Sequence, residues 1–197
     1  MVIDRPRPSG EKLSVSRLGM PRRAGALISV GTESFSPLGL GLSMTIDYAT
    51  HKLSIGRKLP DENSEFRLPM RHHRLSLVRG LLNDKRPTYF VVDTGGEVIS
   101  ISTTTAEELD HDIPRKIALR VYGTSGWDRD AFLMPGVDLK FNQINYKNFA
   151  VVVLNLQAPS VLLGFQVGGI VGHKFLSPYR VSLDLDRSEL RMSKAGS

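Results

Sequence analysis

The most informative stretch of the sequence is Phe90–Gly96, which reads Phe-Val-Val-Asp-Thr-Gly-Gly. Its apolar residues predict a buried strand that ends at Asp93. The two glycines after Thr94 predict a tight turn, because glycine permits backbone angles that other residues avoid. A strand that delivers a carboxylate into such a turn suits catalysis, but Asp-Thr-Gly can equally close an ordinary hairpin.

A second stretch, Gly168–Gly172 (Gly-Gly-Ile-Val-Gly), supplies the context. An apolar pair that ends in glycine lets another loop pass close to its backbone, although an ordinary buried strand followed by a turn has the same pattern. In this order, the two stretches resemble the retropepsin-like aspartic protease family, over about residues 68–193. In that family the Asp-Thr-Gly loop and the apolar-apolar-Gly segment pack together beneath the active site.

The resemblance implies an all-β fold, a closed barrel-like acid-protease lobe with one or two short helices. One helix would cover His173–Leu176, and the closing strand would cover Arg180–Leu185. The residues that it implies for the site fall into three groups. They are the catalytic Asp93 with its loop Thr94, Gly95 and Gly96; the apolar support Ile170, Val171 and Gly172; and a substrate-binding flap at Gly123, Thr124, Ser125, Gly126 and Trp127.

Two residues near the loop depart from the family or could disturb it. Gly96 stands where the family more often has Ala or Ser. Glu97 could affect the neighbouring carboxyl or simply face water. For the flap, a plain β-turn with a surface Trp127 is about as good an interpretation.

The chemistry implied is that of an aspartic endopeptidase. Two carboxylates close together share one proton, because both cannot ionise easily, and the ionised one activates a water. Asp93 lies in the only Asp-Thr-Gly of the chain. The second carboxylate would come from another copy in a homodimer, or from a missing first lobe. The alternative is a non-catalytic peptide-binding or dimerisation module of the same fold.

Composition and pattern agree with a β-rich chain. Hydrophobic residues make up 41%, and 18 glycines and 11 prolines are scattered between short apolar runs. Asn83-Asp84 is the expected corner of a turn between Gly80 and Pro87. Thr105–Glu108 has the spacing of a helix capping box. Strands are expected at 42–48, 53–55, 74–78, 88–92, 117–122, 130–134, 137–141, 149–156 and 181–185.

The N-terminal part carries a partial repeat. We expect a basic extension at 1–65, with the repeat at 30–56 and a linker at 57–65, and the protease domain at 66–197. Val30–Pro37 matches Val171–Pro178 in spacing, and each is followed by a strand that ends in Asp, at Asp47 and Asp184. The copies differ by a four-residue insertion before Asp47. The repeat indicates duplication and looks like the tail of a preceding lobe.

Charge and residue types exclude several other classes. The net charge is +6, and residues 1–75 hold 12 Lys/Arg against 7 Asp/Glu. A solvated basic extension explains this better than nucleic-acid binding. Cysteine is absent, no apolar run could span a membrane, and no signal peptide is evident. His72-His73 and Asp110-His111-Asp112 are better explained as surface groups than as metal ligands. We expect no metal and no cofactor, a peptide or protein substrate, and no assignable location.

Overall fold

The computed structural model describes residues 13–16, 37–109, 117–123 and 126–194. For 13–16, 122–123 and 126–127 it describes the backbone only. The strands are β1 (Leu13–Ser16), β2 (Ser43–Asp47), β3 (Lys52–Gly56), β4 (Phe66–His72), β5 (Ser76–Leu82), β6 (Arg86–Val92), β7 (Ile99–Ser102), β8 (Ile117–Ala118), β9 (Val121–Gly123), β10 (Gly126–Asp128), β11 (Phe132–Phe141), β12 (Ile144–Leu154), β13 (Gly169–Val171), β14 (Tyr179–Asp184) and β15 (Glu189–Lys194). The helices are η1 (Leu38–Leu40, 3-10), α1 (Thr103–Leu109), α2 (Gln157–Leu163) and α3 (His173–Leu176).

A closed barrel forms the larger part of the molecule. Its strands follow the order β5-β6-β13-β7-β12-β11, and a pairing of β11 with β5 closes the ring. β13 runs parallel to β6 and antiparallel to β7, so it lies between the strands before and after the Asp93 loop. The barrel interior is apolar, with Phe90, Phe141 and Phe175 fully buried. The predicted all-β, barrel-like fold is thereby confirmed.

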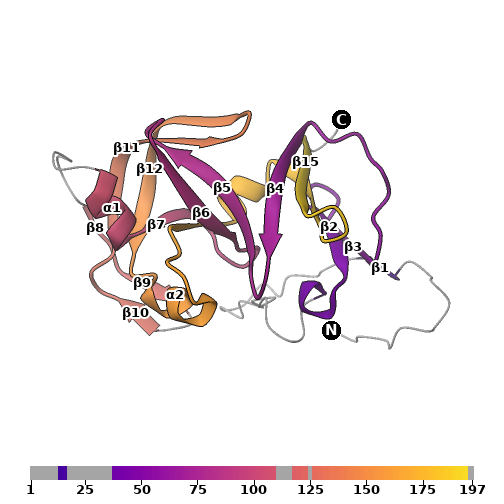
Figure 1. The fold of residues 1–197 in the computed structure, drawn as a ribbon, viewed down its shortest axis with the longest axis horizontal. Helices are drawn as coiled ribbons and strands as arrows, with labels where there is room; N and C mark the ends of the chain where they lie inside the picture. Colours follow the sequence, from indigo (N-terminus) through magenta and orange to yellow (C-terminus); the bar gives the residue numbers. More distant parts are fainter. Residues whose placement is uncertain (1–12, 17–36, 110–116, 124–125, 195–197) are drawn as a thin grey trace.

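A second sheet region lies beside the barrel. Its strands follow the order β1-β3-β2-β14-β15-β4. β4 belongs to both parts, because Phe66–Pro69 pair with β15 and Met70–His72 pair with β5. Figure 1 shows β4 between the barrel strands on the left and β2, β3 and β15 on the right. The predicted hairpin at 42–48 and 53–55 is present as β2 and β3.

The segment between β3 and β4, predicted as a linker, packs on β14 and β15. Glu62 accepts a hydrogen bond from Arg180 at 2.9 Å, and the Asn63 carbonyl accepts one from Ser193 at 3.1 Å. The Pro60 carbonyl accepts two from Arg191, which is itself buried beside Asp184. The segment therefore ties the N-terminal hairpin to the lobe. The boundary at residue 65 stays a prediction.

Two local expectations were wrong in detail. Asn83 and Asp84 form the corner as predicted, with φ of 48° and 55°, but β5 continues through Gly80 to Leu82. A Cβ on Gly80 would lie 2.7 Å from a ring carbon of Phe141, so this glycine serves core packing rather than the turn. The first turn of α1 is capped by Ser102, whose hydroxyl accepts from the Thr105 N–H at 3.0 Å.

Helix is confined to short segments in the described part of the chain. The predicted helix at His173–Leu176 is present as α3, whereas α2 was not predicted. None of the described helices is long and apolar enough to cross a membrane.

Phe175 offers a test of the barrel core. Its ring centroid lies 4.8 Å from that of Phe141, and its side chain is fully buried. We expect Phe175→Ala to lower the free energy of unfolding by about 3–5 kcal/mol, through lost burial and the cavity left behind. Urea unfolding of this variant and of Val161→Ala, whose side chain is exposed, measures the difference. Equal losses in the two variants would contradict the assigned core.

Candidate active site

Asp93 sits at the end of a strand buried inside the barrel wall. β6 ends at Val92, which lies opposite Val171 of β13. The Asp93 N–H donates to the Val171 carbonyl at 3.0 Å, which extends that pairing by one residue. Asp93 itself is only partly buried. The residue therefore lies at the rim of the barrel rather than inside it.

The turn after Asp93 is closed by its own backbone. The Gly95 N–H donates to Asp93 Oδ1 at 2.9 Å, and the Gly96 N–H donates to the Asp93 carbonyl at 3.3 Å. The first bond fixes one carboxylate oxygen and leaves Oδ2 for other contacts. No hydrogen bond of the Thr94 hydroxyl is found within the described residues. The assignment of Thr94 to the active-site loop stays a prediction.

The loop rests on the second glycine-rich stretch. The His173 N–H donates to the Gly96 carbonyl at 2.6 Å, and the Lys174 N–H donates to the Glu97 carbonyl at 2.9 Å. A Cβ on Gly172 would lie only 2.3 Å from the Gly96 carbonyl oxygen. Because that contact is with backbone, any side chain at 172 would force the loops apart. The structure thus brings together the two stretches that the sequence singled out.

Gly96 and Glu97 can now be placed. A Cβ on Gly96 would lie 3.0 Å from Asp93 Oδ2, so an alanine there would press on the carboxylate in its present orientation. The side chain of Glu97 is exposed. Of the two interpretations of Glu97, the structure favours the one in which it faces water.

The residues expected to form the flap belong in part to a two-stranded ribbon. β9 pairs with β10 through Gly123 and Gly126, and through Tyr122 and Trp127. Thr124 and Ser125 at its tip lie outside the described residues, as does the side chain of Trp127. At the base of the ribbon, Asp128 accepts a hydrogen bond from the Asn155 N–H at 2.8 Å. The ribbon is thus anchored to the end of β12, and its role as a flap stays a prediction.

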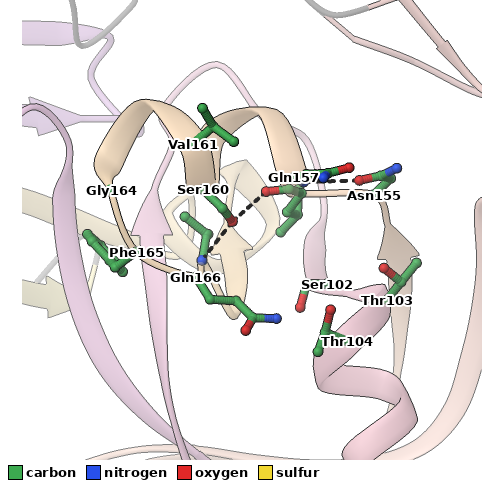
Figure 2. A pocket seen from close by; sticks show the side chains of 12 residues that line it. Ser102, Thr103, Thr104, Asn155, Gln157, Ser160, Val161, Gly164, Phe165 and Gln166 are labelled. Carbon is green, nitrogen blue, oxygen red and sulfur yellow. Dashed lines mark hydrogen bonds between the residues drawn. The ribbon is translucent and has the colours of Figure 1, made fainter.

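A cavity of about 610 Å³ lies between α2 and the start of α1. Its lining residues are Ser102, Thr103, Thr104, Asn155, Leu156, Gln157, Ser160, Val161, Gly164, Phe165, Gln166 and Val167. None of them belongs to the Asp93 loop, so the cavity is separate from the candidate catalytic group. Figure 2 shows Ser102 and Thr104 facing α2 across the opening.

The wall of this cavity is ordered by one hydroxyl. Ser160 donates to the Leu156 carbonyl at 2.6 Å and accepts from the Val167 N–H at 2.9 Å (Figure 2). Sequence reasoning missed both the helix and the cavity. Pro159 near the start of α2 and Gly164 at its end, with φ of 73°, are typical helix boundary residues and could have revealed the helix.

Metal-ligating groups do not gather in the described part of the chain. His72 Nδ1 lies 3.0 Å from the Ser76 hydroxyl, and burial together with the nearby His73 lowers the pKa of His72. Asp110, His111 and Asp112 lie outside the described residues.

Gly172 gives the sharpest test of the crossing loops. We expect Gly172→Ala to lower the free energy of unfolding by roughly 3 kcal/mol or more, because its methyl group would overlap the Gly96 carbonyl. Gly96→Ala is the matched control, because its closest contact is longer, at 3.0 Å, and is with a side-chain atom rather than with backbone. Urea unfolding should show a small loss in the free energy of unfolding for Gly96→Ala and a larger loss for Gly172→Ala, both relative to the parent. A Gly172→Ala protein as stable as the parent would rule out the crossing.

Comparisons with known proteins agree with this geometry. A family model described as aspartyl protease matches residues 78–172, which span both stretches. EIAV protease complexed with the inhibitor HBY-793 is 21% identical, with a TM-score of 0.40, over 52% of this chain and 85% of that one. A retropepsin-like aspartic protease from Rickettsia conorii is 17% identical, with a TM-score of 0.47, over 68% of this chain and 96% of that one.

None of the curated proteins compared is significantly similar to the chain. The family match covers β5 to Gly172, which includes the Asp93 loop, the ribbon of β9 and β10, and the glycine that supports the loop. Residues 78–172 of the chain, which hold both stretches, match the aspartyl protease family.

Proposed function

We propose that the chain contributes one half of the active site of an aspartic endopeptidase, with Asp93 as its catalytic carboxylate. The single observation that carries the proposal is the position of Asp93. Its loop is pinned to Val171 and His173 by backbone hydrogen bonds, while its carboxyl group stays partly exposed at the barrel rim. A carboxyl group that is rigidly held and still accessible can meet a second acid and a substrate.

The proposed reaction is hydrolysis of a peptide bond by an activated water. The ionised carboxylate of the pair takes a proton from the water, which attacks the scissile carbonyl carbon. The protonated carboxyl donates its proton to the carbonyl oxygen as that oxygen gains charge. The amine leaves after it accepts a proton from the pair. Two carboxylates that share one proton provide both functions and titrate as a unit.

The substrate would be a peptide in extended conformation. The ribbon of β9 and β10 stands where the family has its flap, and it would cover the peptide from above. Backbone hydrogen bonds between peptide and ribbon would supply affinity that depends little on sequence. The cavity beside α2 borders Asn155, which holds the base of the ribbon, and is a candidate site for a substrate side chain.

The second carboxylate has to come from another lobe, because Asp93 lies in the only Asp-Thr-Gly of the chain. Two sources are open, a second copy of this chain and a lobe with its own acidic loop. Either would have to approach Asp93 across a two-fold or pseudo-two-fold axis.

A two-loop variant tests the catalytic proposal directly. In this variant a second copy of residues 66–172 replaces residues 1–31. Gly172 of the added copy then directly precedes Thr32, in the position that Gly31 holds in the parent. We expect it to cleave a denatured protein at acidic to neutral pH and to be blocked by a statine peptide. Asp93→Asn in either copy should lower the rate about a hundredfold or more.

Glu97→Gln is the matched control, because it removes an exposed carboxylate four residues away and should leave the rate near that of its parent. Cleavage that survives Asp93→Asn in both copies would contradict the proposal. A folded two-loop variant without any cleavage would instead favour the non-catalytic peptide-binding or dimerisation module.

A further inference from the structure

The strand pairing in the second sheet region joins equivalent positions of the repeat. The repeat aligns Asp47 with Asp184, and therefore Thr45 with Ser182. In the structure Thr45 lies directly opposite Ser182, and their hydroxyl oxygens are 2.8 Å apart. A local two-fold axis therefore passes between Thr45 and Ser182 and relates β2 to β14.

The symmetry extends through the neighbouring strands. β3 pairs with β2 so that Leu53 opposes Ile46, and β15 pairs with β14 so that Leu190 opposes Leu183. These are equivalent positions of the repeat. At the two outer edges, β1 pairs with β3 and β4 pairs with β15. The two pairings use equivalent positions of the repeat on β3 and β15. The sheet consists of two matching halves, β1-β3-β2 and β14-β15-β4.

This arrangement occupies the edge that a second copy would need. In a symmetric dimer with the two Asp93 residues facing each other, the β14 strands of the two copies would pair with each other. That pairing would need the same edge of β14, in the same register, that β2 already occupies. β14 has β2 on one side and β15 on the other, so its backbone groups are already paired on both sides. The chain's own hairpin stands in the place of the second copy.

Only one half of the sheet carries a barrel in the described part of the chain. β4 leads into the barrel, and β14 and β15 follow α3 at its end. The side chains of Leu183, Leu190 and Met192 on this half are 1%, 0% and 0% exposed. Their equivalents on β2 and β3, namely Ile46, Leu53 and Ile55, are only partly buried. β2 and β3 thus match the closing strands of a lobe, but no barrel in the described part of the chain covers their apolar side chains.

We propose that the partner that completes the Asp93 site is a second acid-protease lobe that lacks its own closing hairpin and takes β2 and β3 in its place. This inference rests on the proposed function for the identity of the site. The partner carries its own Asp-Thr-Gly or Asp-Ser-Gly loop, and it covers Ile46, Leu53 and Ile55 with aliphatic side chains. A second copy that pairs through β14 is not this partner.

Cysteine cross-linking of the full chain separates these two arrangements. The chain has no cysteine, so introduced thiols are the only ones present. Directly opposed residues on neighbouring strands are within disulfide reach. We expect Thr45→Cys/Ser182→Cys to form a disulfide within one chain under mild oxidation. Ser182→Cys alone should stay monomeric at high protein concentration.

Ser54→Cys/Ser182→Cys is the matched control. Ser54 opposes Thr45 on β3, so it lies two strands from Ser182, about 10 Å away and beyond disulfide reach. We expect no disulfide within the chain for this pair. Rapid formation of a disulfide dimer by Ser182→Cys would place two copies of β14 together and overturn the inference.

The two-loop variant then tests the partner itself, because its added copy brings a barrel and an acidic loop without a closing hairpin. We expect a monomer in which amide exchange of β2 and β3 slows about tenfold or more relative to the parent, as a covering lobe protects them. Unchanged exchange would overturn the inference. A protected monomer that cleaves nothing would refute the proposed function and leave the partner assignment intact. Cleavage by a disulfide-linked dimer of the Ser182→Cys variant would do the reverse.

Discussion

The contact between two glycine-containing loops supports the rest of the structure. Gly172 brings its backbone so close to the Gly96 carbonyl that no side chain fits between them. The hydrogen bonds from His173 and Lys174 then hold the loop that follows Asp93. Because β13 lies between β6 and β7, the same segment fixes both strands that flank this loop. The position of the carboxyl group is thus set by barrel closure rather than by the loop alone.

A second constraint comes from the sheet beside the barrel. The axis between Thr45 and Ser182 relates β2 to β14, and an axis of this kind would place two acidic loops opposite each other in the proposed site. The axis lies within one chain, because the N-terminal hairpin pairs with the closing strand of the lobe. The segment of residues 57–65 reinforces this arrangement through the bonds of Glu62 and Asn63 to β14 and β15. β2, β3 and the segment of residues 57–65 are therefore bound to the sheet that contains β14 and β15.

Sequence reasoning worked where a local pattern has one physical solution. The apolar run into Asp93 and the glycine of the second stretch specify a buried strand and a close approach, and both are present. The repeat of Asp47 and Asp184 gave the equivalence of the two hairpins. It did not show that they pair with each other, because register between distant strands is set by long-range packing.

Other features had weak or misleading local signals. Gly80 looked like part of a turn, but it lies within β5 where the Phe141 ring needs space. Ser102 rather than Thr105 caps α1, because the helix begins at Thr103, three residues earlier than the capping pattern implied. The cavity beside α2 depends on how that helix sits against α1, which no short stretch of sequence encodes.

The most direct test of the central claim is a crystal structure of the two-loop variant with a bound statine peptide. We expect the statine hydroxyl to lie between the carboxyl groups of Asp93 and its copy, within hydrogen-bond distance of both. An inhibitor bound elsewhere, or an Asp93 carboxyl turned into solvent with no acid opposite it, would show that Asp93 is not the catalytic carboxylate.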